Sequence, residues 1–204
     1  MVIGVSEACT LDQVRQMYEV NVFGALRVNH AALPHMRQQG SGLLIYLSSS
    51  GASLVYPFMG MYGSTKSALE AIAETLHYEV YQSGIDTTIL QAGTYATSLA
   101  TNVKAAANQQ VWDSYGAVGQ IAQAFTTGFP IALSPERAAD PHLLADTVAH
   151  IVELPAGQRP LKLPIGPFTE GVQAINQATE PIQQYVLPAL GLQMLLERDP
   201  RSER

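Results

Sequence analysis

Two side chains at the start of a predicted helix are spaced for acid–base chemistry. Tyr62 and Lys66 lie four residues apart, just before residues 67–80, where apolar residues recur every three or four positions. On an α-helix this spacing puts both side chains on one face, a turn apart. A phenol with a pKa of about 10 is a poor acid or base at neutral pH, but a neighbouring ammonium lowers that pKa by stabilising the phenolate. The pair therefore predicts a tyrosine acid/base assisted by lysine.

A cluster of hydroxyls precedes this helix. Ser48, Ser49 and Ser50 follow the apolar residues 43–47. A short apolar run of this kind predicts a buried parallel strand, here with polar groups at its carboxyl end. A serine hydroxyl held beside Tyr62 could hydrogen-bond a carbonyl or alcohol oxygen and orient a substrate for proton transfer.

The strand, the serines, the gap and the helix start together resemble the short-chain dehydrogenase/reductase family. In that family the catalytic serine lies thirteen positions before the tyrosine, which implies Ser49 rather than Ser48 or Ser50. The resemblance implies an enzyme that interconverts a carbonyl and an alcohol, with hydride from NAD or NADP. Tyr62 would be the general acid/base, and Lys66 would lower its pKa and hold the nicotinamide ribose.

The sequence Asn-Val-Phe-Gly, which begins at Asn21, lies inside a predicted helix. Asn21 and Gly24 each cost up to ~1 kcal/mol there relative to Ala, so we expect a kink or a water inserted in the backbone ladder. The resemblance implies that Asn21 is the fourth member of a catalytic tetrad, whose backbone holds a water that links Lys66 to solvent.

Residues 92–97 resemble the Pro-Gly-x-x-x-Thr turn of the same family, with Ala92 in place of the usual proline. The resemblance implies that Gly93 and Thr97 bind the cofactor at the nicotinamide carboxamide. Taken without the resemblance, this segment reads as an ordinary turn with a Ser/Thr cap.

The elements around these residues predict an α/β fold with a Rossmann-like parallel sheet and flanking helices. Further strands are expected at residues 85–91 and 159–166, and the two prolines of the latter suit a sheet edge. Residues 1–9 are expected to form a loop. One helix is expected to begin at a capping box formed by Thr10 and Gln13 and to close at Pro34 and residues 40–42. A second helix is expected from near residue 61 to residue 84. Another is expected after an N-cap at residues 140–141.

Three regions follow from this organisation. Residues 1–166 are expected to form the catalytic portion, and residues 167–204 a C-terminal helical extension that packs on its own domain or on a partner subunit. The resemblance implies that residues 98–133 are a substrate lid within the catalytic portion. Four aromatic residues are candidates for an apolar pocket wall or, equally, for core or surface positions: Tyr95, Trp112, Tyr115 and Phe125.

Composition narrows the function classes. A net charge of −6 and a pI near 5.3 argue against nucleic acid, because phosphate binding needs clustered Lys and Arg. Cys9, the single cysteine, excludes an internal disulfide, and the five histidines show no metal-ligand spacing. No apolar run reaches the ~18 residues of a membrane span, and residues 1–8 do not read as a signal peptide. We expect a cytoplasmic protein whose partner is a small carbonyl or alcohol substrate, and the resemblance allows a homo-oligomer.

A Gly-rich phosphate-binding turn, which dinucleotide binding requires, does not occur in this sequence. The resemblance covers about residues 3–166 and lacks the first half of the family's fold, so about three strands of its sheet are retained. We favour an N-terminally truncated chain, or a gene start misplaced at an internal methionine, over a naturally short protein. Either way the strand at residues 43–47 should expose an unpaired edge, which favours aggregation or pairing with another molecule.

Two other functions compete with the oxidoreductase. A catalytically silent scaffold or interaction module would explain the missing phosphate turn. A serine hydrolase built on Ser48, Ser49 or Ser50 lacks the Gly-x-Ser-x-Gly elbow that such enzymes use.

Overall fold

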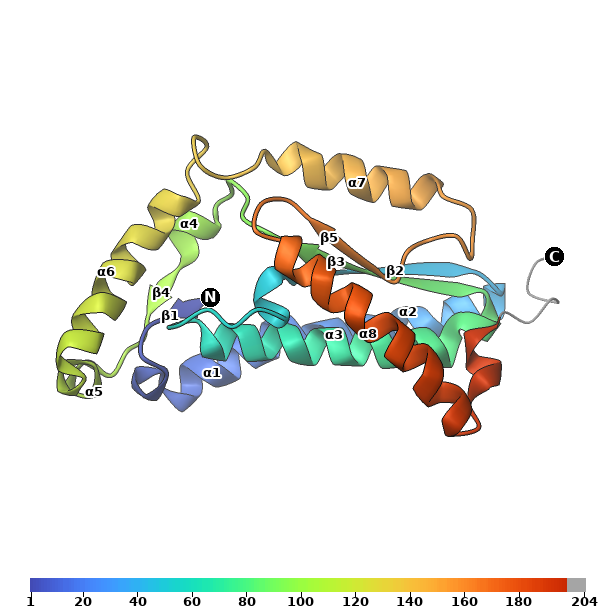
Figure 1. Cartoon of the computed structure of the whole chain (residues 1–204), viewed down its shortest axis with the longest axis horizontal. Coiled ribbons are helices and arrows are strands. Elements are labelled where there is room, and N and C mark those ends of the chain that lie inside the picture. Colours follow the sequence, from blue (N-terminus) through green and yellow to red (C-terminus); the bar gives the residue numbers. More distant parts are fainter. Residues whose placement is uncertain (198–204) are drawn as a thin grey trace.

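Three parallel strands form the central sheet (Figure 1). The structure is a computed structural model that describes residues 1–197. The strands are β2 (Gly42–Ser49), β3 (Ile85–Ala92) and β5 (Lys162–Ile165), in the order β2-β3-β5. Ser49 pairs with Ala92, and Ala92 with Ile165, so the carboxyl ends of all three strands lie at one edge of the sheet. The predicted α/β, Rossmann-like class is confirmed.

Helices cover both faces of this sheet. They are α1 (Leu11–Tyr18), α2 (Gly24–Gln39), α3 (Gly60–Val80), α4 (Leu99–Asn102), α5 (Gln109–Ser114), α6 (Gly116–Ala132), α7 (Pro141–Glu153) and α8 (Glu170–Ala189). Figure 1 shows α7 on one face, with α2, α3 and α8 on the other. The middle strand β3 is buried along nearly its whole length, which explains its run of Ile, Thr and Leu.

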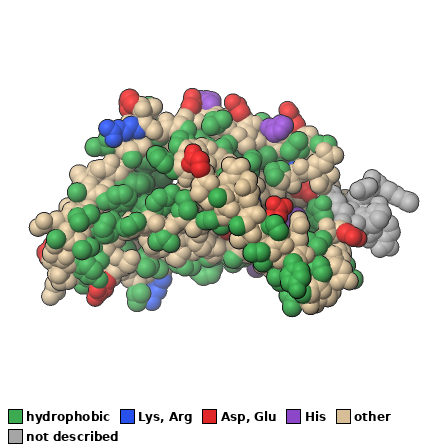
Figure 2. Space-filling model, in the orientation of Figure 1, with side chains coloured by type: hydrophobic (Ala, Val, Ile, Leu, Met, Phe, Trp, Pro, Cys, Tyr) green, Lys and Arg blue, Asp and Glu red, His purple; other side chains and the backbone are tan. Residues whose placement is uncertain are grey.

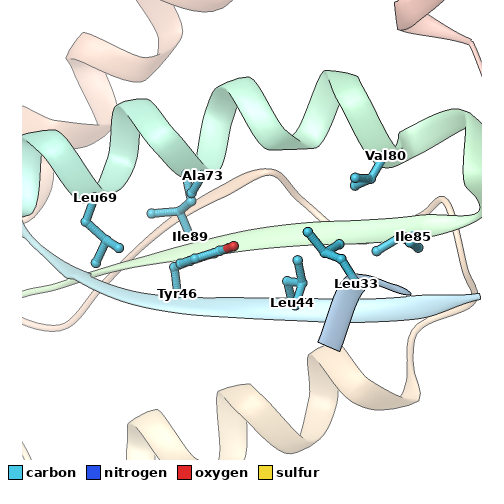
Figure 3. Packing of buried hydrophobic residues seen from close by; sticks show 8 residues of the cluster. All are labelled: Leu33, Leu44, Tyr46, Leu69, Ala73, Val80, Ile85 and Ile89. Carbon is cyan, nitrogen blue, oxygen red and sulfur yellow. The ribbon is translucent and has the colours of Figure 1, made fainter. Parts of the chain in front are cut away.

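The main core lies between α3 and the sheet (Figure 3). Side chains alternate along β2, so Leu44 and Tyr46 face the helix while the residues between them face away. Each fully buried Leu or Ile contributes about 1.5–3 kcal/mol, so this contact holds α3 firmly on the strands. The cluster consists of Leu33, Leu44, Tyr46, Leu69, Ala73, Val80, Ile85 and Ile89.

A second cluster lies at the end of the molecule where α5 and α6 project (Figure 1). It is built around Trp112, which is buried and donates from Nε1 to the carbonyl of Gly119 at 3.0 Å. Beside it, β1 (Val2–Ile3) pairs with β4 (Lys104–Ala105). The predicted loop at residues 1–9 is therefore wrong in part, because a two-residue strand and a short 3-10 helix, Ser6–Ala8, lie there. Figure 2 shows hydrophobic side chains gathered over this end.

The helix boundaries agree with the predicted caps except at one proline. Thr10 and Gln13 form the reciprocal capping box of α1. Pro34 does not close α2, which continues to Gln39 and ends at Gly40 with φ +70°. A proline removes one backbone donor, and the surrounding turns of a helix packed on a core keep the helix intact. Gly84, with φ +77°, ends the 3-10 turn that follows α3.

The last predicted elements are also present. β5 lies at the sheet edge, as its prolines predict, and Asp140 caps α7 through the backbone N–H of His142. α8 packs against β5 of its own chain, and residues 198–204 of the predicted extension lie outside the described residues. In the described part of the chain, no helix combines the length and the apolar character that crossing a membrane requires.

Candidate active site

Three of the predicted site residues converge at the carboxyl end of β2. Tyr62 and Lys66 lie on successive turns at the start of α3, with the Lys66 Nζ 6.0 Å from the centre of the tyrosine ring. Ser49 is the last residue of β2, and its side chain forms a hydrogen bond with Tyr62. The loop after β2 is turned by the same serine, whose Oγ accepts from the backbone N–H of Gly51 at 3.1 Å.

A close backbone approach brings this loop to the helix. A Cβ added at Gly63 would lie 2.9 Å from the carbonyl oxygen of Gly51. Only glycine allows the chain after Ser49 to pass so near the first turn of α3. Gly63, which sequence reasoning passed over, therefore sets the distance between serine and tyrosine.

Burial dominates the electrostatics of the pair. It raises the pKa of Tyr62, and the hydrogen bond from Ser49 only partly opposes this. Burial also lowers the pKa of Lys66, against the attraction of Glu70. The Nζ of Lys66 donates to the carbonyl of Leu47 at 2.8 Å, and the expectation that Lys66 lowers the pKa of Tyr62 stays a prediction.

Asn21 lies in a five-residue π-helical turn, Glu19–Phe23, between α1 and α2. The widened turn takes the place of the predicted kink or inserted water. Its side-chain amide donates to Thr65 Oγ1 at 2.9 Å, and that hydroxyl donates to the carbonyl of Tyr62 at 2.7 Å. Thr65, which the sequence reasoning missed, is fully buried and links Asn21 to the tyrosine turn.

Gly93 and Thr97 lie in the segment that leaves β3. A Cβ on Gly93 would lie 1.9 Å from the carbonyl oxygen of Pro167, so packing alone requires glycine there. Thr97 is exposed, and its Oγ1 accepts from the backbone N–H of Leu99 at 3.3 Å. Each residue thus has a local structural role, and cofactor contact by either stays a prediction.

A cavity of about 130 Å³ adjoins Tyr62, between α3 and the loop at residues 51–60. A larger one, of about 640 Å³, lies between α3 and α8 and includes Glu70. None of the four predicted wall aromatics lines either cavity. Trp112 belongs to the second core, Tyr115 donates to Glu7 Oε2, and the ring of Phe125 lies 6.0 Å from that of Phe58. Tyr95 is buried, and its hydroxyl has no hydrogen-bond partner among residues 1–197.

No group of three or more His, Cys, Asp or Glu side chains within residues 1–197 is arranged to hold a metal ion. The free cysteine, Cys9, is partly buried in the second core, and burial raises the pKa of its thiol. A raised pKa disfavours the reactive thiolate.

Comparison with known proteins identifies the family. Residues 2–108 match the family model described as short chain dehydrogenase, and the chain belongs to that family. An uncharacterized oxidoreductase of Bacillus subtilis, YusZ, is 35% identical over 96 residues, which are 47% of this chain and 34% of that protein. The 3-ketodihydrosphingosine reductase of Bacteroides thetaiotaomicron is 27% identical over 187 residues, 90% of this chain and 66% of that protein.

Solved structures share the fold. A short-chain dehydrogenase from Streptomyces avermitilis matches 94% of this chain and 66% of its own, with a TM-score of 0.68 and 24% identity. A serine dehydrogenase complexed with NADP+ matches 82% of this chain and 61% of its own, with a TM-score of 0.64 and 18% identity. The chain thus spans between about a third and two thirds of the length of these proteins.

Proposed function

We propose that this chain carries the acid–base centre of an NAD(P)-dependent oxidoreductase that interconverts a carbonyl and an alcohol. The observation that carries the proposal is the convergence of Ser49, Tyr62 and Lys66 at the carboxyl edge of a parallel sheet, where open α/β sheets bind their ligands. Family membership supports it, since relatives are named oxidoreductase and reductase.

The chemistry assigned to each residue follows from its surroundings. A phenol is protonated at neutral pH and burial raises the pKa of Tyr62 further, so in carbonyl reduction Tyr62 begins as the acid. Its O–H donates a proton to the substrate oxygen, which Ser49 orients by a hydrogen bond. Lys66 stabilises the phenolate that remains, and Asn21 supports this turn of α3 through Thr65.

The residues present fit the nicotinamide end of the cofactor. Lys66 Nζ has three N–H donors, and among residues 1–197 its one hydrogen bond goes to Leu47, which leaves two donors for ribose hydroxyls. In this proposal Tyr62 and Lys66 hold the ribose, and Gly93 and Thr97 lie along the carboxamide. When bound, the reduced nicotinamide supplies the hydride. The serine dehydrogenase that shares this fold is complexed with NADP+. Our proposal includes both NAD and NADP as candidate cofactors.

A catalytically silent scaffold is the competing function, because the sequence has no Gly-rich phosphate turn. Calorimetric titration of the purified chain with NADH and with NADPH separates the two. The oxidoreductase predicts saturable heat with at least one of them, largely retained in Tyr62→Phe because Lys66 still holds the ribose. No heat with either cofactor would mean that this 204-residue chain does not bind the cofactor by itself, which favours the scaffold for this chain. The cytoplasmic location and homo-oligomeric state expected from the sequence stay predictions.

A further inference from the structure

Glu70 carries a carboxylate into the protein interior, one helical turn after Lys66. It is 5% exposed and lies beside Leu69 on the face of α3 that packs against the sheet. Removing a carboxylate from water costs several kcal/mol unless hydrogen bonds and nearby charges replace its hydration. The neighbouring strands supply these partners.

Both oxygens of the carboxylate accept hydrogen bonds. Oε1 accepts from Ser48 Oγ at 2.5 Å, and Oε2 accepts from Gln91 Nε2 at 2.9 Å. The other end of the Gln91 amide accepts from Asn176 Nδ2 at 2.7 Å, which fixes the direction of that amide. Burial raises the pKa of Glu70, and the donors that converge on it from β2 and β3 oppose that rise by favouring the ionised form.

These partners are neighbours of the active-site residues. Ser48 directly precedes Ser49 on β2, and Lys66 precedes Glu70 by one turn on α3. Apolar side chains of similar volume would hold the helix to the sheet as well as a buried carboxylate does. What the carboxylate adds is a directed bond to the strand end and a negative charge near the ammonium of Lys66.

The other charged groups near Glu70 are accounted for. Glu74, one turn further on, forms an ion pair with Lys162 of β5 at 2.7 Å. His77, Tyr78 and Glu180 line the same cavity between α3 and α8. Lys162 stabilises the charge of Glu70 and Glu74 opposes it, whereas Glu70 is the carboxylate that acts on Lys66.

We propose that Glu70 is a positioning residue, whose buried carboxylate fixes the end of β2 against α3 and keeps Lys66 protonated beside Tyr62. The inference deepens the proposed function and rests on it for its catalytic meaning. The electrostatics agree in direction, since burial lowers the pKa of Lys66 and the charge of Glu70 raises it.

The decisive measurement is the titration of Lys66 by NMR in the full chain. The sequence holds three lysines, Lys66, Lys104 and Lys162, so selective lysine labelling gives a readable spectrum, and Lys66→Arg assigns the signal. Removing the charge in Glu70→Gln should lower the pKa of Lys66 by about one unit. The matched control Glu74→Gln breaks the pair with Lys162 and should leave the Lys66 titration where it is.

Each outcome decides the proposal. An unchanged Lys66 titration in Glu70→Gln, or an equal shift in both variants, overturns it. If Glu70→Gln does not fold, Glu70→Met, which fills the volume without polar atoms, replaces it with the same expectation. The titration needs neither cofactor nor substrate. It therefore tests the effect of Glu70 on Lys66 even if the chain shows no turnover and the proposed function fails.

Turnover supplies the second readout. In Glu70→Gln the alkaline limb of the kcat–pH profile should move to lower pH, because the pKa of Lys66 falls. The value of kcat should also fall by about tenfold, with little change in KM. Glu70→Asp keeps the charge but shortens the reach to Ser48, so kcat should fall while the alkaline limb stays. A variant that is only less stable would show a lower melting temperature and an unshifted limb, which contradicts the proposal.

Discussion

Tyr62 is held in place through its side chain and its backbone. Its hydroxyl meets Ser49, and its carbonyl accepts from Thr65, which in turn accepts from Asn21. The buried hydroxyl of Thr65 thus carries the link between the π-helical turn and the acid/base. Its position, rather than a contact with substrate, gives it its importance.

We predict that Thr65→Val, which keeps the shape and removes the hydroxyl, lowers the free energy of unfolding by about 1–3 kcal/mol. The reason is that the Asn21 amide loses its acceptor in a partly buried setting. Urea unfolding measures the change. Thr75→Val is the control, since its hydroxyl donates to the carbonyl of Ala71 on an exposed part of the same helix. Equal stability of Thr65→Val and the parent chain would show that the hydrogen bond from Asn21 to Thr65 does not stabilise the fold.

Burial raises the pKa of Tyr46 to about 12, and its hydroxyl donates to Asn29 Oδ1 at 2.7 Å. A raised folded-state pKa contributes stability that is present below the unfolded value of about 10 and is lost as pH rises through 12. Between pH 9 and 11 the parent chain should therefore lose about 1 kcal/mol more stability than Tyr46→Phe. Parallel losses in urea melts of the two proteins would refute this.

Among the elements, α7 is tied to β3 through one arginine. Arg159 donates to Asp86 Oδ2 at 2.8 Å and to the carbonyls of Ile151 and Val152 near the end of α7. Both side chains of this ion pair are largely buried, at 13% and 4% exposure. The pair thus links the start of the central strand to the helix on the opposite face from α3.

We predict that Arg159→Met lowers stability by about 3–5 kcal/mol, since Asp86 loses its cation in the interior. Lys162→Met, which breaks the more exposed pair with Glu74, should cost about 0–1 kcal/mol. Chemical denaturation of both variants gives the comparison. Similar costs for the two would mean that burial does not set the strength of these pairs.

The sequence predicted the elements whose signals are local. The capping box of α1, the apolar strand β3 and the Asp140 cap of α7 each follow from a few adjacent residues. The strands β1 and β4 could not be predicted, because two residues carry no periodicity and pair across about 100 positions. The prediction that Pro34 closes the helix was wrong, because packing of α2 outweighs the local cost of a proline.

The candidate site divides in the same way. Tyr62 and Lys66 were predicted from their spacing and Ser49 from the family resemblance, and the structure brings the three together. Thr65 and Glu70 depend on partners far along the chain, so their roles appear only in the folded protein. A signal for Glu70 did exist: it occupies the apolar face of its helix, four residues after Lys66, where a solvated charge would not lie.

Across the molecule as a whole, the sheet has one conspicuous edge. In the described part of the chain β2 has a strand partner on one side only, and Leu47, near its carboxyl end, is 50% exposed. An unpaired apolar edge is a template for pairing with another chain.

We predict concentration-dependent self-association of the chain through this edge, measured by sedimentation velocity. Leu47→Lys should reduce it, because a charge on the edge strand opposes pairing. Val55→Lys, at a loop position that is 93% exposed, should not. A chain that sediments as a monomer at every concentration would rule out edge pairing.

The central claim is that the Tyr62 phenol delivers the proton in a nicotinamide-dependent reduction. Its most direct test is the rate of ketone-dependent NAD(P)H oxidation by the Tyr62→Phe variant, made in a form of the protein that is catalytically active. The Tyr78→Phe variant, substituted on a later turn of α3, is the control. We predict a loss of about 10²–10⁴-fold in kcat for Tyr62→Phe, with cofactor binding largely retained through Lys66 and Tyr78→Phe near normal. Near-normal turnover by Tyr62→Phe would contradict it.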